Sequence, residues 1–311
     1  MPFSFIKKRM NEVTSLLQEN KRIMSASFVR NYESIFACPI CHSSMKVIDL
    51  KSLICLNLHT FDIAKQGYIN LTTKFVKSKY SMELFEARRR LFNESDFFEP
   101  LSQTIANIIN KHIGKTKKAS SILDMGCGEG SHLDTICNIV NSVHYHKVVG
   151  VGIDLSKEGI LLAAKNYPEH IWAVADLANT PFKQTQFDFI LNILSPSNYA
   201  EFNRLMHEDG LVIKVVPQSG YLKELREHLS LKPEKTSYSN KEIVDRFTES
   251  FQLVDITRLS YIARLNKSSI QSLVRMTPLT WGTTEERVKS FIKDSAPITI
   301  DFDLLVGKKQ V

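Results

Sequence analysis

Four residues with metal-binding side chains form a C-x2-C-x13-C-x3-H array at Cys38, Cys41, Cys55 and His59. A Cys-x2-Cys pair places two thiolates on one tight turn, and the later Cys and His supply two more ligands from a second turn. Zn²⁺ prefers four such ligands, and a site filled by protein on all four sides is structural. His42 is a rival fourth ligand, but its adjacency to Cys41 would strain simultaneous ligation. The array therefore predicts one structural Zn²⁺ with His59 as the fourth ligand.

A glycine-rich loop reads Asp124-Met-Gly-Cys-Gly-Glu-Gly130 and lies between an apolar strand-like run and a helix-like segment. This D-x-G-x-G-x-G pattern differs from the dinucleotide fingerprint G-x-G-x-x-G. Gly126, Gly128 and Gly130 permit a tight turn and close approach of a ligand to the backbone. The compact form suits S-adenosylmethionine, whose amino-acid moiety has no pyrophosphate to cradle. The loop predicts cofactor contacts from Asp124 and the three glycines.

Two acidic residues end the next two strand-like runs. Asp154 follows Val148–Ile153, where a carboxylate can accept hydrogen bonds from both ribose hydroxyls. Asp176 follows Ile171–Ala175, where contacts to adenine usually fall. Together with the glycine loop, the two acids favour an S-adenosylmethionine site over another nucleotide site or a degenerate α/β domain.

Methyl transfer needs few further groups, because the sulfonium is already activated and the enzyme mainly aligns the attack and excludes water. The fourth strand-like run, Phe187–Leu194, leads into Ser195-Pro196. It lacks the Asn-Pro-Pro-Tyr type of element found in exocyclic-amine methyltransferases, which argues against methylation of a base amine. The sequence identifies no catalytic base.

The 311 residues suffice for one large domain and one small one, and the 43% hydrophobic content allows a sizeable core. No apolar run approaches the ~18–20 residues of a membrane span, and residues 1–30 lack the apolar region of a secretory signal. The five cysteines do not resemble a secreted disulfide framework. We therefore expect a cytoplasmic protein with no membrane partner.

The net charge of +7 is unevenly distributed. Residues 1–120 contain 19 Lys/Arg and 10 Asp/Glu, a net charge of +9, whereas the remainder contains 21 and 23, a net charge of −2. A basic face is the electrostatic footprint of a polyanionic partner, although a solvated basic surface is the alternative.

Short strand-like runs and turns surround the Cys/His array, at Phe36-Ala37, Met45–Ile48, Leu53–Cys55 and Tyr68–Leu71. They predict a zinc ribbon over residues 35–72 that is too small to fold on a core of its own. Residues 1–34 are predicted to be a mobile or helical extension. Residues 73–100 are predicted to be a basic linker followed by a helix with the run Arg88-Arg89-Arg90.

Residues 101–311 alternate strand-like and helix-like segments, which predicts a Rossmann-like class I methyltransferase domain with a mostly parallel, doubly wound sheet. After a helix at Ala200–Met206, Gly210 is expected to form a turn into the strand Leu211–Val216. Two further strands are expected at Leu253–Ile262 and Ile298–Val306.

From about residue 35 to 308 the chain resembles the bacterial 23S rRNA (guanine-N1)-methyltransferases of the RlmA type, which include tylosin-resistance enzymes. The resemblance rests on segments that occur together in one chain: Phe36-Ala-Cys-Pro-Ile-Cys41, Cys55-x3-His59, Phe61-Asp-x-Ala-Lys-x-Gly-Tyr-x-Asn-Leu71, Ala87-Arg-Arg89, Leu123-Asp-Met-Gly-Cys-Gly-Glu-Gly130 and Met276-Thr-Pro-x3-Trp281. It implies a guanine in hairpin 35 of 23S rRNA as substrate, S-adenosylmethionine as methyl donor and a homodimer.

The resemblance also implies site residues. The zinc ligands match unchanged, and the family's cofactor contacts fall on Gly128 and Glu129 in the loop. Two more fall on Phe98, where a relative has Tyr, and on Tyr221, where a relative has His, so the ring is kept and the polar tip changes. The Met276–Trp281 segment is expected either to shape the guanine pocket or to pack in the core.

Three functions remain to be compared. In the first, the ribbon and basic linker hold rRNA phosphates while the target guanine enters the α/β pocket, since sequence-specific RNA recognition favours splayed bases. The Arg88–Arg90 run would serve this function or would form a helix face paired with Glu83 and Glu86. The second is methylation of a small molecule, and the third is RNA binding without catalysis.

Overall fold

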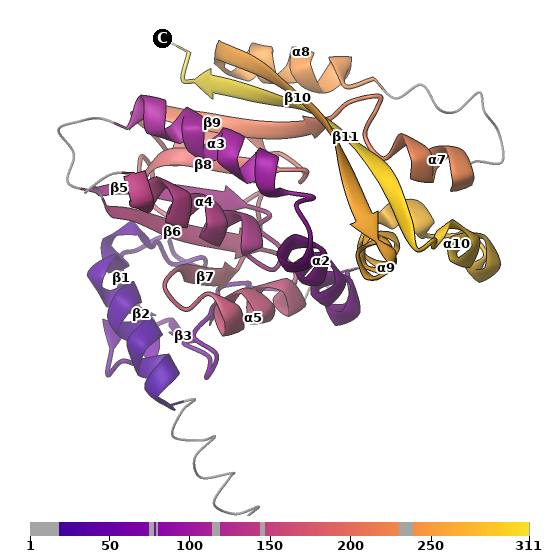
Figure 1. The fold of residues 1–311 in the computed structure, drawn as a ribbon. Helices are drawn as coiled ribbons and strands as arrows, with labels where there is room; N and C mark the ends of the chain where they lie inside the picture. The colour runs from indigo at the N-terminus through magenta and orange to yellow at the C-terminus, as the bar shows by residue number, and fades with distance from the viewer. Residues whose placement is uncertain are drawn as a thin grey trace, which may run out of the picture.

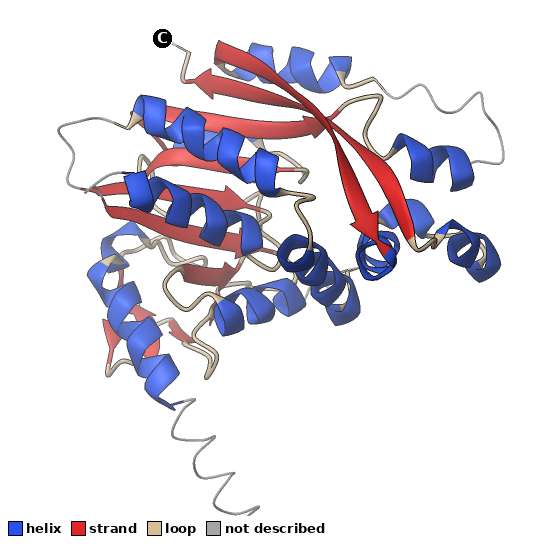
Figure 2. Ribbon diagram, viewed as in Figure 1, coloured by secondary structure: helices blue, strands red, loops and turns tan. Residues whose placement is uncertain are grey.

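The computed structural model describes residues 19–74, 78, 80–113, 119–143, 147–229 and 239–310. Two β-sheets organise these residues, one of three strands and one of eight (Figure 1). Helices pack against the large sheet, and the small sheet lies at one side of the molecule, near the start of the described chain (Figure 2).

The small sheet is an antiparallel ribbon of β1 (Met45–Ile48), β2 (Ser52–Cys55) and β3 (Thr60–Asp62). Alternate residues of β1 are buried, as the two-residue period of a half-covered strand requires. Their apolar side chains join the core on one face of the large sheet. This confirms the predicted ribbon, which shares a core with the larger domain.

The fourth strand expected in the ribbon belongs instead to the large sheet. β4 (Ile69–Asn70) pairs in parallel with β7 (Ile171–Val174) at the sheet edge. Ile69 and Leu71 are buried in the core that the large sheet shares with the ribbon. The expectation failed because these side chains bury more apolar area against a long sheet than against three short strands.

The chain preceding the ribbon is helical over residues 19–31. Ala26 and Val29 on this helix are buried in the same core as the ribbon. Gly67, at φ +98°, passes so close to Ser25 that a Cβ at Gly67 would overlap the serine side chain. Residues 19–31 therefore fit the helical alternative, and residues 1–18 of the predicted extension lie outside the described residues.

The eight strands of the large sheet lie in the order β10-β11-β9-β8-β5-β6-β7-β4. Besides β4 and β7, this sheet contains β5 (Ala119–Met125), β6 (Lys147–Asp154), β8 (Phe187–Ile193), β9 (Met206–Pro217), β10 (Gln252–Asn266) and β11 (Ser295–Lys308). Pairing is parallel from β9 to β4 and antiparallel on both sides of β11. β5 lies between β6 and β8, so the strand order reverses beside it, where α/β sheets bind ligands.

Helices cover both faces of this sheet. They are α2 (Met82–Glu94), α3 (Glu99–His112), α4 (Ser131–Val143), α5 (Lys157–Asn166), α6 (Tyr199–Leu205), α7 (Lys223–Leu229), α8 (Lys241–Ser250), α9 (Lys267–Met276) and α10 (Glu285–Phe291). Residues of α3, α4 and α5 pack in one core cluster, and residues of α6, α8 and the ribbon pack in another. The predicted doubly wound architecture is confirmed.

Three strands are longer than the sequence pattern indicated. β9 begins at Met206, which pairs with Phe187, so Gly210 lies inside the strand and not in a turn before it. A Cβ at Gly210 would crowd Met206 of the same strand. β10 and β11 extend beyond the expected apolar runs because they pair with each other along nearly their whole length.

Candidate active site and metal centre

A cavity of about 710 Å³ opens where β5, β6, β8 and β9 reach their carboxyl ends. Helix α2 and part of the segment 276–281 contribute further wall residues. Among the predicted cofactor residues, five line it: Phe98, Gly126, Gly128, Asp154 and Tyr221. The other four predicted cofactor residues do not line the cavity: Asp124, Glu129, Gly130 and Asp176.

The glycines of the loop after β5 serve two purposes. Gly126 and Gly128 line the cavity with φ values of +89° and +58°, and a Cβ at Gly126 would overlap Ser195. Gly130, at φ +87°, faces away from the cavity, and a Cβ there would lie 2.6 Å from the Trp172 ring. The first two glycines admit a ligand, whereas the third admits close packing of helix on sheet.

Asp154 ends β6 on the cavity wall, as the sequence indicated. Its carboxylate accepts hydrogen bonds from the backbone N–H groups of Gly128 at 2.9 Å and Ser156 at 2.8 Å. Burial raises the pKa of this carboxyl group, and these hydrogen bonds oppose the rise. A carboxylate can accept about four hydrogen bonds, so capacity remains for a ligand.

Asp124 lies beneath the glycine loop, with 1% of its surface exposed. Its Oδ1 has no hydrogen-bond partner within the described residues. Burial raises the pKa of Asp124 to about 7; the Arg88 charge opposes this rise, and the carboxylates of Asp154 and Glu129 add to it. A buried, unpartnered carboxylate oxygen is costly, and a cationic ligand group would relieve that cost.

Glu129 is buried below the loop, where it accepts a hydrogen bond from Ser131 Oγ at 2.5 Å. Its Oε1 lies 3.8 Å from Nε of Arg88. The ion pair of Arg88 is therefore with Glu129 and not with Glu83 or Glu86 on its own helix. The sequence missed this contact because it joins two segments whose proximity depends on how α2 lies across the sheet.

Arg88 itself lines the cavity, with its guanidinium carbon 6.0 Å from the centre of the Phe98 ring. Its Nε has no hydrogen-bond partner within the described residues. An Arg fork with unused donors suits a carboxylate, which it can bind with two parallel hydrogen bonds.

Phe98 and Tyr221 form aromatic parts of the wall. Phe98 stacks on Phe92 with 5.6 Å between ring centres and meets the edge of His132 at 4.8 Å. Tyr221 lies 4.7 Å from the ring of Phe302, and burial raises its pKa to about 12. Both rings are held by neighbouring rings.

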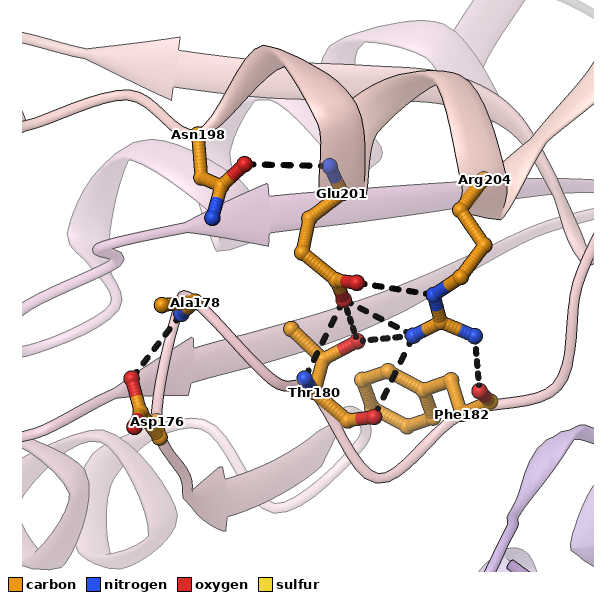
Figure 3. A network of polar contacts seen from close by, with 7 residues as sticks. All are labelled: Asp176, Ala178, Thr180, Phe182, Asn198, Glu201 and Arg204. Atoms are coloured by element: carbon orange, nitrogen blue, oxygen red, sulfur yellow. Dashed lines mark hydrogen bonds and ion pairs between the residues drawn. The ribbon is translucent and has the colours of Figure 1, made fainter.

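Asp176 lies on the loop that follows β7 and is exposed, and it is not among the residues that line the cavity, whereas the adjacent Leu177 lines it. The Asp176 carboxylate accepts a hydrogen bond from the backbone N–H of Ala178 at 2.9 Å (Figure 3). β7 ends at Val174, so the chain has already turned where the sequence pattern still indicated a strand.

A polar network fixes the rest of this loop (Figure 3). Glu201 accepts hydrogen bonds from the backbone N–H of Thr180 at 3.1 Å and its hydroxyl at 2.9 Å. Arg204 donates to Glu201 at 2.7 Å and to the carbonyl oxygen of Phe182 at 2.7 Å. Helix α6 thereby holds the loop, one end of which lines the cavity.

Lys214 is a site residue that the sequence analysis did not single out. It lines the cavity from β9 although only 4% of its surface is exposed. Its Nζ donates to Asn192 Oδ1 at 2.6 Å and to Ser197 Oγ at 2.5 Å. The signal was present as the one charged residue within the apolar run Leu211–Val216.

Part of the Met276–Trp281 segment lines the same cavity. Trp281 is 47% exposed, and its ring lies 5.7 Å from that of Tyr80, also on the wall. The segment thus lies on the cavity wall, and Met276 also packs against the core, so both expectations for this segment remain predictions.

The four predicted metal ligands converge. Their ligand atoms all lie within 4.8 Å of one another. Among the described residues, these four side chains form the cluster of His, Cys and acidic groups that could hold a metal ion. Sγ of Cys38 and Sγ of Cys55 lie 3.5 and 3.4 Å from Nδ1 of His59. Hydrogen bonds from Ser43 lower the pKa of Cys41 to about 5, which favours the thiolate form that binds zinc. The donor set and its closure fit a tetrahedral structural zinc.

The ribbon joins the large domain next to the Glu201–Arg204 network. Phe36 forms an antiparallel bridge with Phe182, and their ring centres lie 5.4 Å apart. The backbone N–H of Ala37 donates to Pro181, and that of Lys183 donates to Ile35. One loop therefore contacts both the zinc ribbon and the cavity.

Comparisons with known proteins agree with both sites. The family model "RlmA, N-terminal" matches residues 36–81, and the model "Methyltransferase domain" matches residues 122–210. The provisionally named 23S rRNA (guanine-N(1)-)-methyltransferase YxjB of Bacillus subtilis (strain 168) is 48% identical over 279 residues, which cover 89% of this chain and 98% of the relative. The chain belongs to the RlmA-type 23S rRNA (guanine-N1)-methyltransferase family.

Two more distant relatives have similar names. The 23S rRNA (guanine(748)-N(1))-methyltransferase of Streptomyces fradiae is 28% identical over 81% of this chain and 88% of its own length. A 23S rRNA (guanine-N(1)-)-methyltransferase, also provisionally named, from Micromonospora griseorubida is 26% identical over 85% and 92%.

As a member of this family, the protein is an S-adenosylmethionine-dependent methyltransferase with a structural zinc in its ribbon. The cavity fits that cofactor: Gly126 and Gly128 leave space for it, Asp154 offers acceptors, and Asp124 has an unpartnered oxygen nearby. In the described part of the chain, no helix is both long and apolar enough to cross a membrane.

Proposed function

We propose that the enzyme transfers a methyl group from S-adenosylmethionine to N1 of a guanine in hairpin 35 of 23S rRNA. The observation that carries the proposal is the union, in one chain, of a zinc ribbon and a methyltransferase cavity that share the loop at residues 176–183. The names of the relatives support N1 of a 23S rRNA guanine as the target, and guanine 748 is the base named for the Streptomyces fradiae enzyme.

The cofactor would lie along the carboxyl ends of β5 and β6. Asp154 would accept hydrogen bonds from the ribose hydroxyls, and Leu177, which lines the cavity where Asp176 does not, would contact the adenine. Gly126 and Gly128 would approach the amino-acid moiety. When bound, S-adenosylmethionine supplies an activated methyl group, and the wall residues orient it and exclude water.

Two charged residues would recognise the amino-acid end of the cofactor. Asp124, with its unpartnered Oδ1, would face the ammonium group, directly or through a water. Arg88 would bind the carboxylate, with Glu129 holding the guanidinium from behind at 3.8 Å. Phe98 and Tyr221 would pack against the cofactor through their rings.

The guanine would enter between the segment that follows β8 and the Met276–Trp281 segment. Trp281 and Tyr80 are aromatic residues with exposed surface on this side, and a base removed from its stack is commonly held between such rings. The pocket would therefore select a splayed guanine.

The ribbon would position the RNA. Both of its zinc knuckles present apolar tips, at Ile40 and at Leu56 and Leu58, which are 54%, 74% and 81% exposed. Lys46, Lys51 and Lys65 are exposed around them. Of the basic linker residues, Lys74 is described, whereas Lys77 and Lys79 lie outside the described residues. Arg89 and Arg90 on α2 would add phosphate contacts.

The proposal also covers the functional units of the chain, its cellular location and its oligomeric state. The functional units would be an extension at 1–34, an RNA-recognition ribbon at 35–72, a linker and helix at 73–100 and the methyltransferase domain at 101–311, with β4 lending its two residues to the large sheet. The enzyme would act in the cytoplasm, on ribosomal RNA, as a homodimer.

The test is methylation of 23S rRNA isolated from a strain that lacks the enzyme. N1 methylation blocks base pairing, so a new primer-extension stop is expected at a guanine of hairpin 35. RNA affinity should also fall steeply with salt, because phosphate contacts release counterions. A protein that binds S-adenosylmethionine but leaves this hairpin unmethylated, with weak and salt-insensitive RNA binding, would favour a small-molecule substrate instead.

A further inference from the structure

Lys214 is a buried amine without a carboxylate partner. It lies in the middle of β9, and its Nζ is surrounded by neutral acceptors: Asn192 Oδ1 at 2.6 Å, Ser197 Oγ at 2.5 Å and the carbonyl oxygen of Ser195 at 3.5 Å. No ion pair of Lys214 occurs among the described residues. An unpaired amine in the interior is costly, and such groups cluster at functional sites.

The acceptors are themselves fixed. Asn192 donates through Nδ2 to the carbonyl oxygens of Met125 and Pro196, which orients its Oδ1 toward Lys214. Ser197 donates its hydroxyl to the same Oδ1 at 3.0 Å and therefore offers lone pairs to Nζ. These contacts hold the amine at one place on the cavity wall.

That place is connected to the cofactor loop through Ser195. The side chain of Ser195 fills the space beside Gly126 in the cofactor loop, and its carbonyl oxygen is the third acceptor near Nζ. Lys214 therefore lines the cavity beside the segment that touches the cofactor loop, and the Met276–Trp281 segment contributes to the same cavity.

Charged groups on the adjoining elements are occupied elsewhere. Asp303 on β11 accepts hydrogen bonds from Gln218 and Asn240. Tyr199 on α6 packs between aromatic rings. Burial raises its pKa, while a hydrogen bond with Ser197 and the Arg246 charge on α8 oppose that rise, so it brings no charge to the Lys214 network. Burial alone lowers the pKa of Lys214 to about 8.

The other ionisable groups on the cavity wall are unsuited to accept a proton. Burial raises the pKa of Tyr221 to about 12. Asp154 is held by two backbone N–H groups at the end of β6. Lys214 lines the wall with a pKa that burial lowers to about 8, and its protonated form has hydrogen-bond acceptors already in place.

We propose that Lys214 is the catalytic base that removes the N1 proton of the target guanine. The neutral amine takes the proton while N1 attacks the methyl carbon with the electron pair of the former N–H bond. The N1–C bond forms as the C–S bond breaks, and the electron pair of that bond stays on sulfur. The products are 1-methylguanine, S-adenosylhomocysteine and a Lys214 ammonium held by Asn192 and Ser197. This inference rests on the proposed function.

The experiment measures single-turnover methylation of hairpin 35 RNA from pH 6.5 to 10 for the wild type, Lys214→Met and Lys214→Arg. The wild-type rate should rise with pH through about 8, because the base acts in its deprotonated form. Both variants should be slower at neutral pH by about 10²–10³-fold, the usual contribution of a general base. Their deficit should shrink at alkaline pH, where guanine loses its N1 proton to bulk water.

Affinities for S-adenosylhomocysteine and for RNA should stay within twofold of the wild type for Lys214→Arg, which shows that the pocket is folded. Lys223→Met, an exposed lysine on α7, is the matched control and should keep the wild-type pH profile. Full activity of Lys214→Arg would overturn the base role in favour of a positive charge alone. An equal deficit at every pH would overturn it in favour of a structural role. Failure of the wild type to methylate hairpin 35 would instead refute the proposed function.

Discussion

Single residues give the sharpest tests of how the cofactor is recognised, and Arg88 is the first. Replacing Arg88 with Met should weaken binding of S-adenosylhomocysteine about 10- to 100-fold, because a charge-assisted hydrogen bond contributes about 1.5–3 kcal/mol. Binding of methylthioadenosine, which lacks the amino acid, should be unchanged. Titration calorimetry with both ligands measures this, and Arg90→Met on the same helix is the control. Equal losses for the two ligands would contradict a contact between Arg88 and the carboxylate.

Asp124 gives a pH-dependent prediction at the same scale. Its pKa is about 7 in the folded protein and near 3.8 when unfolded, so folding takes up a proton between these values. Wild-type stability without cofactor should therefore lose a contribution of a few kcal/mol as pH rises from 4 to 7, relative to Asp124→Asn. Melting temperatures of both proteins across this range measure the difference. A melting-temperature difference between the two proteins that does not change with pH would contradict a raised pKa of Asp124. Loss of S-adenosylhomocysteine binding in Asp124→Asn would show that the buried carboxylate, which lowers stability, is needed to bind the cofactor.

At the scale of elements, the loop held by α6 connects the zinc ribbon to the cavity. Arg204→Met leaves Glu201 partly buried without its cation and should reduce the free energy of unfolding by about 2–3 kcal/mol. Amide exchange should rise in residues 178–183 and in residues 35–37 that pair with them. Lys289→Met, which removes an exposed pair with Glu285, is the control and should leave the stability close to that of the wild type. Exchange confined to α6 would contradict a connection through this loop.

At the scale of the whole molecule, substitutions at the zinc site and at the cofactor cavity should impair different binding properties. Cys38→Ala should lose zinc and RNA affinity while S-adenosylhomocysteine affinity remains close to wild type, because the cofactor walls come from the large sheet and α2. Gly126→Ala should lose S-adenosylhomocysteine affinity and keep zinc and RNA affinity, since its Cβ would overlap Ser195. Zinc content, calorimetry and RNA binding by fluorescence anisotropy distinguish the two variants. Parallel loss of all three properties in either variant would show that the sites are not separable.

Much of this protein could be predicted from its sequence because the relevant signals are local. Four thiolate and imidazole ligands at knuckle spacing require no knowledge of the rest of the chain, and the glycine loop is defined by its own backbone. The alternation of strands and helices likewise predicted the doubly wound sheet and placed Asp154 on the cavity wall.

Only the tertiary structure decided the contacts between distant segments. It brought Arg88 to Glu129, placed β4 in the large sheet, and left Asp176 outside the cavity wall. It also showed that the lysine within an apolar strand lines the cavity beside Asn192. Strand order and the packing of α2 fix these contacts, and both depend on burial of apolar surface over the whole chain, which no short segment encodes.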